Sequence, residues 1–284
     1  MRAASEDVIP PGGGRQPLVR SGIVAACLLY VGLLLLLPLV GIVYTALKPG
    51  LGKVTETFAR PDVQHAFFLT GVITLITVVV TTVFGMITSW VLVRQRFFGK
   101  SFLNALVDLP FALSPVTVGL AAVILFGLGG WLEPFFQSRG ILVIFAVPSM
   151  VLVTIFICIP FTIREVVPVL EEIGKDEEDA ARTLGASILQ TWRKVTLPNI
   201  RWGLLYGVSL TIARSIGEIG AVLIVSGLIS GKTETATLFI FSAIEERQTA
   251  EAYIVALTLA AVSIVLLVAI ETTRHRIEGR KERT

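Results

Sequence analysis

Long apolar stretches alternate with short polar segments along this chain. Six stretches are nearly free of charge: residues 23–47, 68–93, 103–128, 140–163, 203–229 and 252–270. Within them only Asp108, Arg214 and Glu218 are charged. Each stretch is comparable to the ~20 residues that an α-helix needs to cross a membrane, and inside lipid only a helix or a closed barrel satisfies its own backbone. The pattern predicts an all-α integral membrane protein with six transmembrane helices.

The positive charges indicate how these helices are oriented. Lys and Arg resist translocation, so short loops rich in them stay in the cytoplasm. With the amino terminus inside, 17 of the 24 Lys and Arg residues fall on the inner side and six fall in outer loops. Both termini are therefore expected in the cytoplasm. The same asymmetry accounts for the net charge of +3, so no nucleic-acid partner is expected.

The apolar stretches divide the chain into three parts. Residues 1–22, which contain Pro10, Pro11 and three consecutive glycines, are expected to form a flexible cytoplasmic leader. The first apolar stretch is too long for a signal peptide. Residues 23–271 form the transmembrane domain, and residues 272–284 form a basic cytoplasmic tail. Two cysteines, both inside apolar stretches, and two distant histidines support neither a disulfide framework nor a metal site.

The cytoplasmic segment between the fourth and fifth stretches contains the signals of a first short helix. Asp176 is expected to cap it, and the acidic residues that follow suit the positive end of its dipole. Gly185 is placed to end it in the left-handed conformation.

A second helix is expected directly after this turn. Ser187 and Gln190 have the spacing of a capping box, and Pro198 is expected to stop the helix. Together the signals predict a helix–turn–helix hairpin over about residues 175–198. Its apolar positions are too many for so small a unit to bury alone: Ala180, Ala181, Leu184, Ile188, Leu189, Trp192 and Val195. They pack either on the chain's own helices or on a partner protein.

The hairpin also carries a recognisable motif. The run Asp179-Ala180-Ala181, then Gly185, then Val195 to Pro198 has the spacing of the "EAA" loop, with Asp179 at the usual Glu position. The chain therefore resembles the permease subunits of bacterial ABC importers. The resemblance implies a type I importer permease (MetI-like) fold, in which the hairpin docks on an ATPase and couples its motion to the membrane helices. The residues expected to take part in coupling are Glu178, Asp179, Ala180, Ala181, Leu184, Gly185, Trp192, Leu197 and Pro198.

The resemblance extends to further segments that point to one group of importers. These are Asp108–Val116, Arg164-Glu165, Val195–Trp202, Leu204–Val208 and Ile216–Val222 with Val225-Ser226-Gly227. They are similar to the sulfate/thiosulfate permease subunits. Ile219 stands where that group more often has an aromatic residue, and the outer segment 233–246 departs from its pattern. Molybdate and tungstate permeases are the alternative.

The same resemblance implies a set of partners. They are a dimer of ATPase subunits, a second homologous permease, an extracytoplasmic sulfate-binding protein and the lipid of a bacterial inner membrane. ATP and Mg would be bound by the ATPase, which leaves this chain without a cofactor or a catalytic role. The sequence agrees, because Gly231-Lys232-Thr233 lacks the first glycine of a phosphate-binding loop, with Ser226 at that position.

Polar residues inside the helices are candidates for a translocation path. Arg214 and Glu218 lie four positions apart in the fifth stretch, so they are expected on one face of the predicted helix. Ionisable residues at membrane depth mark functional sites by default. They either meet the transported anion or neutralise each other to fix helix packing. Thr74, Thr77 and Ser226 are weaker candidates, since threonine stripes also serve close helix packing.

Two prolines mark the third stretch. Pro110 and Pro115 are expected to kink or interrupt it, and Asp108 is expected to cap it near the cytoplasm. Two rival classes fit less well. An intramembrane enzyme would need a larger set of reactive groups than Arg214 and Glu218. An ion-coupled carrier would more often show an internal repeat.

Overall fold

A computed structural model describes residues 16–281, and within this range the regular elements are all helical. Residues 1–15 of the expected leader and 282–284 of the expected tail lie outside it. α1 (Gln16–Leu47) begins inside the segment assigned to the leader, and α13 (Thr249–Lys281) continues through most of the segment assigned to the tail. The expected all-α fold is confirmed.

Four helices are long and apolar enough to cross a membrane without a break. They are Ser21–Leu47 in α1, α3 (Pro61–Arg94), α7 (Val147–Ile173) and Thr249–Ile270 in α13. Two further spans are broken. α4 (Lys100–Ala112) and α5 (Pro115–Phe126) meet at 112°, and the helix that ends at Ile216 meets α11 (Gly220–Ser226) at 52°. The predicted number of six is reached when each bent pair is one span.

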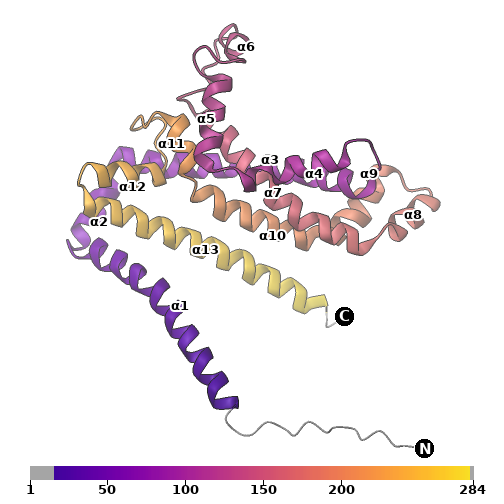
Figure 1. The fold of residues 1–284 in the computed structure, drawn as a ribbon, viewed down its shortest axis with the longest axis horizontal. Helices are drawn as coiled ribbons and strands as arrows, with labels where there is room; N and C mark the ends of the chain where they lie inside the picture. The colour runs from indigo at the N-terminus through magenta and orange to yellow at the C-terminus, as the bar shows by residue number, and fades with distance from the viewer. Residues whose placement is uncertain (1–15, 282–284) are drawn as a thin grey trace, which may run out of the picture.

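Three of these helices form the centre of the bundle. α3, α7 and α10 (Leu197–Ile216) lie side by side along the long axis of the molecule (Figure 1). Glycines allow the close approach: a Cβ at Gly85 or Gly207 would lie within 3 Å of Thr162 in α7. Small residues at helix contacts are typical of membrane bundles.

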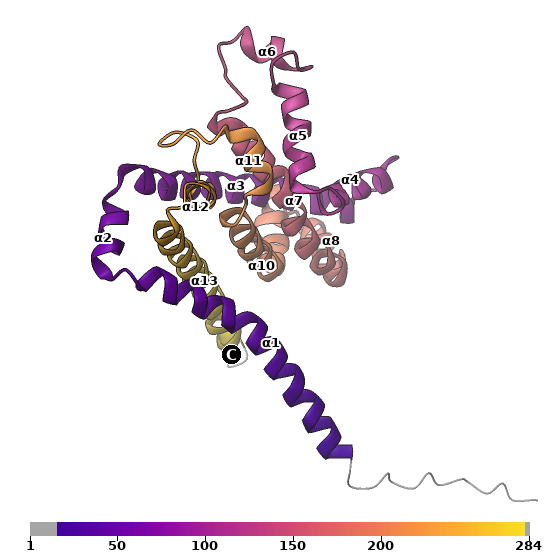
Figure 2. The same cartoon turned by 60° about the vertical axis from the view of Figure 1, so that its left-hand side comes forward.

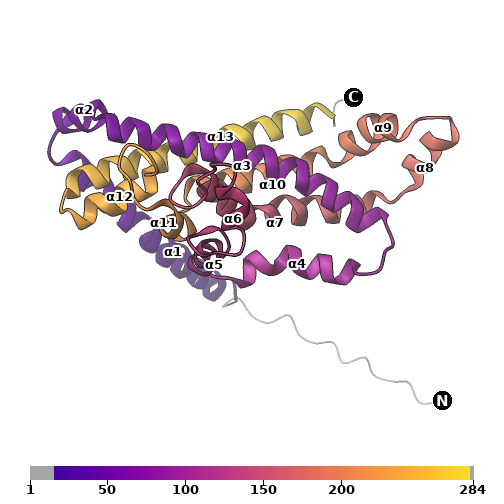
Figure 3. The ribbon, with the colours of Figure 1, turned by 90° about the horizontal axis from the view of Figure 1, so that it is seen from above.

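The two ends of the bundle are clearly different. α8 (Asp176–Thr183) and α9 (Ile188–Thr191) lie at one end, whereas α2 (Leu51–Ala59) and α12 (Ala236–Glu245) lie at the other (Figures 1 and 3). The sequence did not predict α12. Its N-cap is Thr235, whose hydroxyl accepts a hydrogen bond from the Leu238 amide, and Phe239 packs in a core that includes Val63 and Val255.

Two parts extend away from the bundle. α1 packs mainly against α13, diverges from it (Figure 2) and exposes most of its leucines. α5 and the short α6 (Glu133–Gln137) project sideways as an arm (Figure 2). Lipid or another subunit must cover apolar surface of this extent.

Two boundaries differ from those expected. α7 begins at Val147 instead of residue 140, because Pro148 sits in its first turn and Ala146 before it is extended. Asp108 does not cap a helix: it lies inside α4, and its carboxylate is 2.6 Å from Nη2 of Arg164 in α7. Pro115 interrupts the third stretch as predicted, since the preceding Ser114 is extended.

Candidate functional site

The first arm of the hairpin is α8. It begins one residue earlier than expected, with Lys175 at the N-cap position, so Asp176 is wrong as the cap and instead joins three other acidic residues in the first turn. Gly185 adopts φ +86°, the left-handed conformation predicted for the end of this helix. The Ala186 amide donates to the Ala181 carbonyl at 3.0 Å, which closes the turn.

The second arm opens with the predicted capping box. The Gln190 amide donates to Ser187 Oγ at 3.3 Å, and the Ser187 amide donates to Gln190 Oε1 at 2.8 Å. These two bonds fix where the chain turns from one arm to the other.

Pro198 does not stop this second arm, contrary to the prediction. A π-helical turn, η1 (Trp192–Thr196), joins α9 to α10, and Pro198 lies in the first turn of α10. The wider π turn allows the helix to continue past Pro198, although this residue has no amide hydrogen to donate. The hairpin is therefore continuous with the fifth span over residues 188–216.

The largest aliphatic residues at the tip of the hairpin remain uncovered, whereas Ala181, Trp192 and Val195 are partly buried. Leu184, Ile188 and Leu189 expose 90%, 72% and 73% of their surface. Between the arms lies a groove of about 320 Å³, lined mainly by small residues and by long polar ones: Ala181, Leu184, Gly185, Ala186, Gln190, Thr191, Lys194 and Val195. Such a surface can receive apolar side chains of another protein.

One of the expected coupling residues faces inward. Glu178 is buried, and its carboxylate receives hydrogen bonds from Arg94 and from Thr196. Asp179 and Ala180 beside it are exposed. Arg94 could not be singled out from the sequence, where it was one of several basic residues expected on the cytoplasmic side.

Arg214 and Glu218 flank the break in the fifth span. They do not share one face of a continuous helix, because α10 ends at Ile216. The ion pair still forms, with Arg214 Nη1 2.5 Å from Glu218 Oε2. Glu218 Oε1 also accepts the Ala221 amide at 2.9 Å, and the Thr237 hydroxyl donates to the Glu218 carbonyl. The Glu218 side chain is 2% exposed and that of Arg214 is 30% exposed, so Arg214 is the more exposed member of the pair.

The other path candidates are buried at separate places. The hydroxyls of Thr74 and Thr77 in α3 have no hydrogen-bond partner among the described residues. Ser226 ends α11, where its hydroxyl accepts the Leu228 amide. A polar cavity beside Glu218 measures about 10 Å³, which is room for one water molecule and not for an oxyanion.

α5 and α11, the second halves of the two broken spans, pack on each other. Gly220, the first residue of α11, would place a Cβ 2.9 Å from Cβ of Pro115, the first residue of α5. Val118, Ala122, Ala221 and Val225 belong to the core beneath this contact. Broken helices of this kind line transport sites in membrane carriers.

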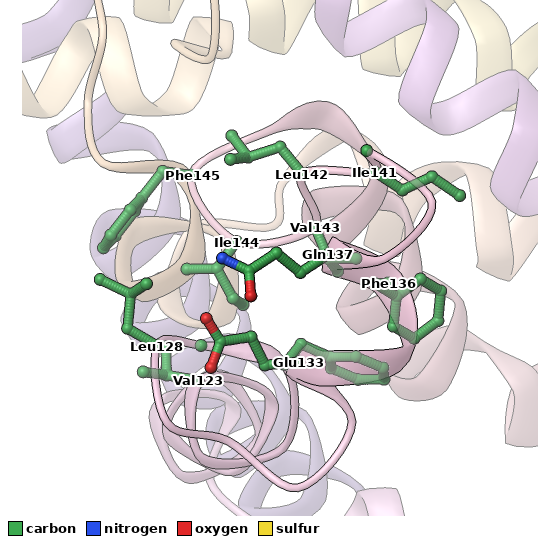
Figure 4. Close-up of a pocket in the computed structure, with 13 residues that line it drawn as sticks. Val123, Leu128, Glu133, Phe136, Gln137, Ile141, Leu142, Val143, Ile144 and Phe145 are labelled. Atoms are coloured by element: carbon green, nitrogen blue, oxygen red, sulfur yellow. The ribbon is translucent and has the colours of Figure 1, made fainter.

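A larger cavity, of about 550 Å³, lies in the arm formed by α5, α6 and residues 140–145 (Figure 4). In Figure 4 the Glu133 carboxylate and the Gln137 amide point toward one another among apolar side chains. The Glu133 carboxylate accepts the Gly129 amide at 2.6 Å. Since Glu133 is the one charged residue of the lining, this cavity disfavours an anion.

Known proteins resemble the chain in both sequence and fold. Residues 81–282 match the family described as "Binding-protein-dependent transport system inner membrane component". The protein named "Sulfate transport system permease protein CysW" of Synechocystis sp. is 46% identical over 91% of this chain and 94% of its own length. The protein of that name in Escherichia coli K12 is 42% identical over 98% and 94%.

The fold has been seen in a solved assembly. A crystal structure of a bacterial alginate ABC transporter, in complex with an alginate pentasaccharide-bound periplasmic protein, includes a chain that matches with a TM-score of 0.75. The match covers 93% of this chain and 97% of that chain at 15% identity. The expected ABC importer permease fold is therefore confirmed.

Proposed function

Because this chain belongs to the family of binding-protein-dependent transport system inner membrane components, we propose that it is the sulfate/thiosulfate permease subunit of an ATP-driven importer. One observation carries the proposal: an uncovered apolar hairpin continues without a break into the fifth span. A partner that moves the hairpin can thereby change the position of membrane helices.

Sulfate is the substrate that the relatives favour. Two proteins with 42–46% identity over most of this chain carry the name of a sulfate transport system permease. The accessible guanidinium of Arg214 supplies a positive contact for a divalent oxyanion, while Glu218 limits how tightly that anion is held.

The energy source lies in another subunit. In this proposal the exposed groove between α8 and α9 receives an ATPase, which binds ATP and Mg, and the permease itself is not catalytic. The small side chains of Ala181 and Gly185 leave room for an apolar side chain of that ATPase.

The remaining partners follow from the shape and the family. A second, homologous permease would cover the exposed side of α1 and the arm of α5 and α6. An extracytoplasmic sulfate-binding protein would deliver the anion at the end formed by α2 and α12. Both termini would lie in the cytoplasm of a bacterium, on the side of the hairpin, and alternating access would move the anion across the inner membrane.

Uptake by cells that lack this subunit tests the proposal. Restoring the chain together with its partner subunits should restore accumulation of labelled sulfate, and thiosulfate should compete with it. An equal excess of molybdate should leave the rate unchanged. Competition by molybdate with no accumulation of sulfate would instead support the molybdate/tungstate alternative.

A further inference from the structure

A buried ion pair connects the docking hairpin to the bundle. Arg94 is the last residue of α3, and Glu178 lies in the first turn of α8. The Arg94 Nε donates to both carboxylate oxygens at 3.2 Å, and Nη2 donates to Oε1 at 3.1 Å. The two side chains are 5% and 7% exposed.

The same guanidinium also binds the end of α7. Its Nη1 donates to the Leu170 carbonyl at 3.0 Å, and its Nη2 donates to the Gly174 carbonyl at 2.5 Å. In return, the Lys175 ammonium donates to the Arg94 carbonyl at 3.1 Å. Arg94 therefore holds the terminus of α7 and the start of α8 in one place.

The carboxylate makes a third connection, to the other arm. The Thr196 hydroxyl, at the end of the π turn, donates to Glu178 Oε1 at 2.9 Å. One buried carboxylate thus joins α8 to α3 and to the start of α10. The planar guanidinium satisfies carboxylate and carbonyls together in a fixed geometry, which a lysine ammonium cannot reproduce.

The position of this pair separates it from the docking surface. Leu184, Ile188 and Leu189 are exposed, whereas Glu178 is turned into the bundle. A second cytoplasmic ion pair, Arg164 with Asp108, offers a contrast, because its side chains are 32% and 49% exposed and water screens them. Because the Arg94–Glu178 pair is buried, separating its two charges costs more free energy than separating Arg164 from Asp108.

We propose that Arg94 and Glu178 are positioning residues that make α8 move as one body with the inner ends of α3 and α7 when a partner displaces the hairpin. Neither residue touches the anion or the nucleotide. The proposal rests on the function proposed above, since it explains how motion at the hairpin reaches the helices that enclose the path.

A distance measurement tests the rigid body without any transported substrate. Spin labels at Thr183 in α8 and at Arg96 beyond α3, both exposed, report on the pair in a chain whose Cys27 and Cys158 are replaced by alanine. In the assembled complex the labels should give one narrow distance that is unchanged by a non-hydrolysable ATP analogue. Glu178→Gln should broaden this distance and make it depend on the nucleotide. A distance that changes with nucleotide in the unmutated chain, or that is unaffected by Glu178→Gln, would overturn the proposal.

A transport measurement shows whether the rigid body matters for coupling. In proteoliposomes, Glu178→Gln and Arg94→Gln should retain the bound ATPase and its hydrolysis, while the sulfate accumulated per ATP falls at least tenfold. Arg94→Lys keeps the charge but loses the carbonyl contacts, so its loss should be intermediate. A purely structural role would lower the amount of assembled complex and leave the ratio unchanged, which would also overturn the proposal.

The control is Glu172→Gln, the same chemical change at an exposed position near the end of α7. Its ratio of sulfate to ATP should equal that of the unmutated complex. If the unmutated complex accumulates no sulfate or recruits no ATPase, the proposed function fails. The distance between the two spin labels still tests the role of the ion pair in that case. Glu178→Gln should broaden the distribution of this distance in the chain alone.

Discussion

Gly119 of α5 lies so close to Ala221 of α11 that a Cβ at position 119 would be 2.9 Å from the Ala221 carbonyl oxygen. The same Cβ would be 2.9 Å from Cβ of Ile224. Backbone therefore meets backbone where the two broken spans cross. α5 and α11 can approach this closely because Gly119 has no Cβ.

We expect Gly119→Ala to push α5 and α11 apart. Overpacking of a tight contact costs about 1–3 kcal/mol, so the unfolding midpoint in detergent and the rate of sulfate uptake should both fall. Gly71→Ala in α3 is the matched control, because nothing lies within 4 Å of the added Cβ. A Gly119→Ala protein as stable and as active as the Gly71→Ala protein would contradict this contact.

Leu184→Ser should weaken binding of the ATPase subunit without destabilising the isolated permease, since Leu184 is almost fully exposed in this chain. Burial of a leucine at an interface contributes about 1.5–3 kcal/mol, so we expect a roughly ten- to hundredfold rise in the Kd. Titration of the ATPase onto permease in lipid nanodiscs measures it. Leu51→Ser, an exposed leucine at the opposite end, should have no effect.

Substitutions at Gly185 can show whether docking requires the left-handed backbone conformation or the absence of a side chain. Its φ of +86° costs a β-branched residue about 1–2 kcal/mol, whereas asparagine adopts this region more readily. Gly185→Val should therefore reduce the amount of ATPase that co-purifies, and Gly185→Asn should retain most of it. Equal losses in both variants would show that any side chain here obstructs docking.

The charged pair at the break can be neutralised without leaving one charge alone. In the double variant Arg214→Gln/Glu218→Gln, the glutamine at 218 can still accept the Ala221 amide, so the unfolding midpoint should change little. If Arg214 meets the anion, sulfate uptake should fall about tenfold, which corresponds to ~1.4 kcal/mol.

Neutralising the partly exposed pair between α4 and α7, Arg164→Gln/Asp108→Asn, provides the comparison. Its uptake should stay close to that of the unmutated protein. Unchanged uptake in the Arg214→Gln/Glu218→Gln variant would mean that Arg214 and Glu218 serve helix packing alone.

The features that could be predicted from the sequence depend on local patterns. Apolar length predicted the spans, and short-range signals predicted the turn at Gly185 and the capping box of Ser187 and Gln190. Pro198 misled the prediction, because a proline in a first helical turn looks the same in sequence whether a helix starts there or continues through a π turn.

Long-range contacts could not be predicted in this way. Arg94 and Glu178 are 84 residues apart, and their pairing depends on how α3, α7 and α8 are placed in space. The inward direction of Glu178, next to an exposed Asp179, likewise follows from packing and not from residue type. α12 was missed because its ten residues are too few for a membrane span, and its burial is decided by α3 and α13.

The uninterrupted helix over residues 188–216 has a mechanical consequence. At 1.5 Å per residue its length is roughly 43 Å, so a tilt of about 10° around one end would displace the other end by roughly 7 Å. A small rotation about Ile188 would therefore displace Gly217 by more than the diameter of a sulfate ion. No loop lies between these two points to absorb it.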